Sequence, residues 1–157
     1  MTPRTSWMAG LLLGFMATAV LPSCDKDDDD DEQPKVTYQL SGAASGAKEV
    51  PPVITNATGT LSGTYNRNTN KLEYTITWND LSGVPTMMHF HGPASATENA
   101  SPVVNITGFT AAESGTATGT ADLTDEQETQ LLDGKWYYNI HTPDHGGGEI
   151  RSQVDVQ

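Results

Sequence analysis

The sequence predicts an all-β fold, an antiparallel β-sandwich of about eight strands with one short connecting helix. Apolar and polar residues alternate with a period of two over several short stretches, a pattern typical of half-buried strands. Gly, Asn and Pro residues separate these stretches, as expected of the turns between antiparallel strands. Only one stretch combines helix-capping residues with the spacing of a helix.

The clearest strands lie in the first half of the chain. Alternation begins at 36–40, and four evenly spaced apolar residues make 71–78 the strongest strand in the sequence. The Thr- and Gly-rich run 58–65 precedes it, and the Asn-rich segment 66–70 fits a hairpin turn between the two because Asn tolerates positive φ.

The second half predicts further strands around one helix. The predicted strands are 86–91, 103–106, 115–123, 135–142 and 149–156. Thr124 is the expected N-cap of the helix, and Gln127 three residues later completes a capping box. Gly134 is the expected C-cap, so the helix connects two strands and has only about two to three turns.

Residues 1–23 have the pattern of a lipoprotein signal peptide and are not expected to belong to the fold. Arg4 gives a positive start, and an apolar run of 15 residues from Trp7 to Leu21 is too short for a comfortable membrane span. Leu21-Pro22-Ser23-Cys24 resembles a bacterial lipobox and contains the only cysteine. We therefore expect export and a membrane anchor through lipid on Cys24; the alternatives are a plain secretory signal with an incidental cysteine and an uncleaved anchor.

Residues 24–35 are expected to form an acidic, disordered tether. Seven of the eight residues in 25–32 are carboxylates, which repel one another and cannot be buried. The run resembles the acidic export signal of surface lipoproteins in Bacteroidetes, which favours display on the outer membrane surface over retention in the periplasm. The net charge of −12 without a cluster of Lys and Arg excludes nucleic acid as a partner. The folded domain is then expected to span 36–157.

Histidines on strands 86–91 and 135–142 form the strongest candidate site. Alternation turns His89 and His91 to one face of their strand, and it turns His141 to the polar face of the other. If these strands are neighbours, the three imidazoles suit a copper or zinc ion with a fourth position open. Periodicity alone does not place the two strands side by side.

Four further polar residues are expected to support this site: Asn139, His145, Glu149 and Arg151. Asn139 or Glu149 would orient an imidazole, and Glu149 could pair with Arg151 two residues away. His145 lies in a Gly-rich turn and is a weaker candidate ligand. Without a metal, the same residues would form a structural hydrogen-bonded network, and the sequence leaves both interpretations open.

No catalytic residue is predicted from the sequence. No Ser, Thr or Cys has an identifiable base and orienting group beside it, and no carboxylate pair stands out as a glycosidase dyad. The Gly146-Gly147-Gly148 run lacks the Lys and Ser/Thr of a phosphate-binding loop.

Several blocks in order along the chain resemble the CHRD domain, a family named for chordin and found in many bacterial exported proteins. The blocks are Glu49-Val50-Pro51-Pro52, Thr58-Gly59-Thr60, His89-Phe90-His91-Gly92-Pro93-Ala94, Tyr137-Tyr138-Asn139-Ile140-His141-Thr142 and Gly148-Glu149-Ile150-Arg151. The resemblance covers 36–157 and departs from the family's pattern at Ser152, where glycine is usual.

The resemblance implies an immunoglobulin-like sandwich or barrel and, because the family has no established catalytic activity, a non-enzymatic binding or structural module. Its protein or small-molecule partner is not specified, and no cofactor is expected. The alternative is a copper- or zinc-binding protein, possibly redox-active, that uses His89, His91 and His141. The His-x-His strand is also similar to one in copper,zinc superoxide dismutase, but that enzyme's other ligands, disulfide and electrostatic loop have no visible counterparts.

Overall fold

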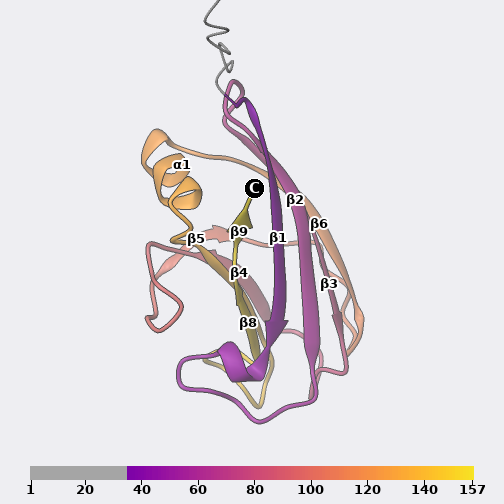
Figure 1. The fold of residues 1–157 in the computed structure, drawn as a ribbon. Coiled ribbons are helices and arrows are strands. Elements are labelled where there is room, and N and C mark those ends of the chain that lie inside the picture. The colour runs from indigo at the N-terminus through magenta and orange to yellow at the C-terminus, as the bar shows by residue number, and fades with distance from the viewer. Residues whose placement is uncertain (1–34) are drawn as a thin grey trace, which may run out of the picture. The chain divides into compact units, whose positions relative to one another are not determined.

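Residues 35–157 are described by a computed structural model, in which they form nine strands, one α-helix and one short 3₁₀-helix (Figure 1). The elements are β1 (Thr37–Ser45), η1 (Gly46–Lys48), β2 (Thr58–Asn66), β3 (Lys71–Asn79), β4 (Met87–His91), β5 (Pro102–Asn105), β6 (Gly115–Asp122), α1 (Asp125–Leu132), β7 (Tyr137–His141), β8 (Ile150–Gln153) and β9 (Asp155–Val156). The predicted signal peptide, the proposed lipidation site at Cys24 and all but the last residue of the predicted tether lie outside the described residues.

One antiparallel sheet curls into a nearly closed barrel. Eight strands follow the order β5-β4-β7-β8-β1-β2-β3-β6, and β9 adds to β1 beside this path. The long strands β1, β2, β3 and β6 form one wall, and the shorter strands of the other wall lie across from them (Figure 1). The all-β, antiparallel prediction with about eight strands is confirmed, and the barrel is the form it takes.

The predicted hairpin between 58–65 and 71–78 is present as β2 and β3. The two strands pair over nine residues each, from Thr58 opposite Asn79 to Asn66 opposite Lys71. Asn70 closes the turn with a φ of 53°, the left-handed conformation that Asn tolerates better than most residues. The local sequence therefore sets both the strands and their register.

The barrel interior is filled by the apolar residues that the period-two pattern turns inward. On β4, Met88 and Phe90 are each 1% exposed, while His89 between them faces outward and is half-buried. The largest side chains of this core, all fully buried, are Trp78, Trp136, Tyr65, Tyr138, Phe90, Leu72, Ile76, Met88, Leu131, Ile140 and Ile150. The site described below lies on the opposite side of β4 and β7 from this core.

The helix α1 begins as predicted at Thr124. Its side chain accepts a hydrogen bond from the Gln127 backbone, and the Gln127 side chain accepts one from the Thr124 backbone, which completes the capping box. Glu128 accepts hydrogen bonds from Tyr65 Oη and Arg67 Nε, so α1 is tied to the end of β2. No helix within residues 35–157 is long and apolar enough to cross a membrane.

The predicted last strand, 149–156, is divided into β8 and β9. The break falls at Val154, where the pairing with β7 ends: Gln153 lies opposite Tyr137, and the Val154 N–H donates the last bond, to the Trp136 carbonyl. β9 then pairs with β1, and Gln157 exchanges two backbone hydrogen bonds of 2.9 Å with Gln39. The strand predicted at 135–142 begins two residues later, at Tyr137.

Gly63→Ala should destabilise the domain because β2 and β3 approach closely there. A Cβ at Gly63 would lie 2.5 Å from the Glu73 backbone oxygen, which no side-chain rotation can relieve. Overpacking of this kind costs about 1–3 kcal/mol, more than the roughly 0.5–1 kcal/mol that Ala gains over Gly in a strand. Urea unfolding measures the difference.

Gly83→Ala is the matched control. Its Cβ would meet only the Pro143 ring, at 3.5 Å, an ordinary contact. We expect its unfolding free energy to stay within about 0.5 kcal/mol of wild type. Equal stabilities of the two variants would contradict the assigned β2–β3 packing.

Candidate metal centre

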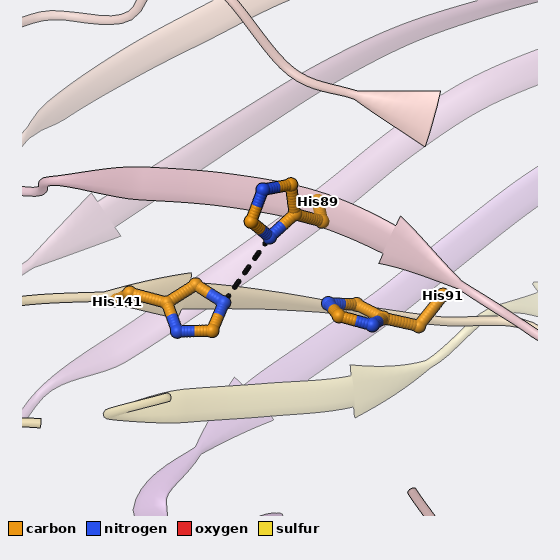
Figure 2. A group of neighbouring side chains, drawn as sticks. All are labelled: His89, His91 and His141. Atoms are coloured by element: carbon orange, nitrogen blue, oxygen red, sulfur yellow. Dashed lines mark hydrogen bonds between the residues drawn. The ribbon is translucent and has the colours of Figure 1, made fainter. Parts of the chain in front are cut away.

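The three histidines lie together because β4 and β7 are hydrogen-bonded neighbours, which periodicity alone did not establish. The register pairs Met87 with His141 and His89 with Asn139, and β8 continues the row by placing Arg151 opposite Asn139. Figure 2 shows the imidazoles of His89, His91 and His141 gathered on this side of the sheet. The structure thus brings together the three residues that the sequence selected as candidate ligands.

The ring nitrogens are close enough to hold one ion after a small adjustment. His89 Nδ1 lies 3.2 Å from His141 Nε2, and one nitrogen from each of the three residues lies within 4.8 Å of the others. Metal–nitrogen bonds of about 2.0–2.1 Å in tetrahedral geometry require nitrogens roughly 3.3–3.4 Å apart. One pair already has this spacing, and the third ring must approach by up to about 1.4 Å. The buried histidine triad could therefore hold a metal ion.

Backbone carbonyls fix the tautomers of two of the three rings. His91 Nδ1 lies 2.9 Å from the Ala100 carbonyl, and His141 Nδ1 lies 3.0 Å from the Gly146 carbonyl. A carbonyl oxygen only accepts, so both Nδ1 atoms carry the proton and both Nε2 atoms keep a lone pair. Metal-binding histidines commonly donate their second nitrogen to such a carbonyl. The Nε2 atoms of His91 and His141 are thus available donor atoms, whereas His89 Nδ1 donates to His141 Nε2 in the metal-free protein and would need its proton on Nε2 instead to bind an ion.

Burial keeps the imidazoles uncharged near neutral pH. His91 and His141 are each 6% exposed, and His89 is half-buried. Burial, followed by repulsion from His141 and His91, lowers the pKa of His89 to about 4. Burial is also the largest cause of the lowered pKa values of His91 and His141. Metals bind the neutral form, so the rings are already in the state that coordination requires.

Asn139 lies next to the triad and connects it to Glu49. His91 Nε2 is 2.9 Å from Asn139 Oδ1. Asn139 Nδ2 donates to the Gly147 carbonyl at 3.4 Å, so it is the amide oxygen that faces His91, and an ion at Nε2 would replace this contact. Gly148 fits only because it lacks a side chain: a Cβ there would lie 2.3 Å from Glu49 Oε1 and 2.6 Å from Asn139 Nδ2.

Glu49 is a buried acid to which the sequence analysis assigned no role. It is 5% exposed, and burial raises its pKa to about 7 against the opposing effects of Arg151 and Asn139. It also lines a cavity of about 520 Å³ between Val50 and Thr97. The residue is thus placed between the triad and a space of small-molecule size. Its position in the Glu49-Val50-Pro51-Pro52 block was the only signal available in the sequence.

Arg151 holds the loop that supplies the Ala100 carbonyl. The residue is 1% exposed and donates from Nη1 and Nη2 to Asn99 Oδ1 and to the carbonyls of Ser95 and Glu98, at 2.8–3.1 Å. Its guanidinium lies 3.5 Å from the centre of the Tyr137 ring, which in turn stacks on His91 with centroids 4.6 Å apart. Since β7 lies between β4 and β8, the Tyr137 ring has His91 on one side and Arg151 on the other.

Glu149 and His145 lie apart from the triad. Glu149 is fully buried and accepts hydrogen bonds from Thr55, Ser82 and Thr142. Burial acts to raise its pKa, but these hydrogen bonds together lower it, so Glu149 is an ionised link between three segments. It makes no ion pair with Arg151 among residues 35–157. His145 is in the 143–148 turn and is not among the converging nitrogens.

Comparison with known proteins gives one match. The sequence model of the CHRD domain family matches residues 40–154, which includes every strand that forms the site. No curated protein and no solved structure matches the chain.

The lowered pKa of His89 predicts that the metal-free protein loses stability on acidification. Between its ordinary pKa of 6.5 and its folded value of about 4, the unfolded chain binds a proton that the folded chain does not. This contribution therefore falls as the pH falls through that range. His89→Gln removes the group, so its unfolding free energy should decline less than that of wild type, as measured by urea titration with a chelator present.

Glu49 should act with the opposite sign. Its folded pKa of about 7 lies above its ordinary value of 4.5, so the folded chain binds the extra proton and this contribution rises as the pH falls through that range. On acidification, the unfolding free energy of Glu49→Gln is therefore expected to decline more steeply than that of wild type, whereas that of His89→Gln declines less steeply. Parallel curves for the two variants would show that neither group has the assigned environment.

Proposed function

The chain belongs to the CHRD domain family, and we propose that its domain is a non-enzymatic metal-binding module of the bacterial cell envelope. The ion, copper or zinc, is held by His89, His91 and His141. A lipid on Cys24 anchors the chain to the outer membrane, with the domain on the outer surface. The first part of this proposal is supported by the geometry of residues 35–157, and the second by the pattern of residues 1–35.

The two fixed tautomers are the observation that favours metal binding over a purely structural network. A structural network would be equally well satisfied by rings that donate from either nitrogen. Instead, the Ala100 and Gly146 carbonyls each take the Nδ1 proton, so that Nε2 of His91 and of His141 is left with a lone pair on the same side of the sheet. His89 Nδ1, 3.2 Å from His141 Nε2, completes the donor set once the His89 proton is on Nε2.

The donor set also limits the kind of ion. The three converging groups are all imidazoles, and no carboxylate joins them among the described residues. Calcium and magnesium prefer oxygen ligands, whereas imidazole suits copper and zinc. His89 is only half-buried, which leaves room for water or a small ligand at a fourth position. The proposal is limited to binding, because the sequence predicts no catalytic group and the family has no established activity.

Removing two ligands should abolish stoichiometric metal binding. We expect untagged wild-type protein to bind one equivalent of copper or zinc by isothermal titration and elemental analysis. His89→Ala combined with His141→Ala should weaken binding by more than the roughly 10–100-fold seen when only a supporting partner is lost. His145→Ala is the matched control and should bind as wild type does. Equal weakening by His145→Ala, or no binding by wild type, would refute the site.

Lipid attachment is tested on the full chain in a bacterial host. Labelled palmitate should enter the wild-type protein and the membrane fraction, because acylation of one cysteine with several chains gives a stable anchor. Cys24→Ala should lose the label, whereas Ser23→Ala keeps a small residue before the cysteine and should retain it. Protease treatment of intact cells then separates surface display, in which the domain is digested, from periplasmic retention, in which it is protected.

A further inference from the structure

We infer that the ion is copper, and that Met87 supplies a thioether ligand which makes the site prefer Cu(I) to Zn(II). The inference rests on the proposed function, because it assigns a fourth donor to the same histidine site. It comes from the position of one residue that neither the core nor the hydrogen-bond network uses.

Met87 lies on the histidine side of the sheet. It is the first residue of β4, and alternation along the strand puts it on the same face as His89 and His91. Its neighbour Met88 turns to the core and is 1% exposed. β4 therefore presents Met87, His89 and His91 in succession to the outer face.

The register places Met87 directly beside the third histidine. Met87 is the cross-strand partner of His141, so their Cβ atoms are expected to be about 4.5–5.5 Å apart. The pairing is fixed locally, since the Thr86 backbone N–H donates to the His141 carbonyl at 2.8 Å. Methionine has an unbranched side chain with three rotatable bonds, so its sulfur can turn toward the imidazoles without backbone movement.

Met87 is also free of packing that would hold it elsewhere. It is 46% exposed and is one of four large hydrophobic residues exposed among residues 35–157. An exposed methionine leaves apolar side-chain surface in contact with water, so core packing does not explain its position beside three imidazoles. Coordination of a metal by its thioether sulfur would explain it.

The chemistry of this donor set favours monovalent copper. Thioether sulfur is a soft ligand that selects Cu(I), whereas zinc is well served by imidazoles alone. The proposed ligands are all neutral, and the triad is largely buried. Transfer of an ion into such a site costs less for a single charge than for a double charge, because the desolvation penalty grows with the square of the charge.

Competition titrations test the inference. Wild type, Met87→Leu and Met88→Leu are titrated with Cu(I) under anaerobic conditions against bicinchoninate, and with Zn(II) against a chromophoric chelator. Leucine keeps the volume of each methionine but has no sulfur. We expect Met87→Leu to bind Cu(I) about tenfold or more weakly and Zn(II) within about twofold of wild type, and Met88→Leu to bind both as wild type does.

Each outcome has a defined meaning. Unchanged Cu(I) binding by Met87→Leu overturns the inference while the proposed function stands, and absence of both metals from wild type overturns both. Should Met87→Leu fail to fold, X-ray absorption of Cu(I)-loaded wild type decides the matter. The measurement uses Cys24→Ala combined with Met88→Leu, in which Met87 is the only sulfur of residues 24–157, so a sulfur neighbour of copper supports Met87 as a ligand. A shell of nitrogen and oxygen alone rejects it.

Discussion

Burial of the polar face of β4, β7 and β8 is the constraint on which the surrounding loops depend. Each polar group on this face loses contact with water and must find a partner within the protein. Arg151 finds three oxygens in the loop after β4, His91 and His141 find one carbonyl each, and Glu149 finds hydroxyl groups on three segments. Loops that are distant in the sequence are thereby fixed over one part of the sheet, and the triad lies beneath them.

Local sequence patterns were enough to predict the individual elements. The alternation in β3, the Asn-rich turn before it and the capping box at Thr124 are all short-range signals, and each corresponds to an element of the structure. The adjacency of β4 and β7 could not be predicted in this way, because it depends on how the whole sheet closes. The same is true of the break at Val154, where the last strand leaves its pairing with β7 and begins to pair with β1.

The side chains of the candidate site could be predicted from the sequence, but the backbone groups that contact them could not. Alternation identified His89 and His91 as a pair, and His141 as the third imidazole. The tautomers are set by the backbone carbonyls of Ala100 and Gly146. Because every residue has a backbone carbonyl, the sequence does not show which ones accept from the imidazoles. Glu149 and Arg151 were expected to pair because they share a strand face, yet each is satisfied by a different loop. Proximity along a strand does not decide between partners when loops from elsewhere compete.

The two-sided bonding of β1 has a mechanical consequence. β1 pairs with β2 along its full nine residues on one edge, and with β8 and β9 on the other. A force that pulled residue 35 along the axis of β1 would load the hydrogen bonds on both edges in shear, so they would share the load instead of breaking one after another. A strand held on both edges in this way resists extraction better than an edge strand, because the hydrogen bonds of both edges must break together.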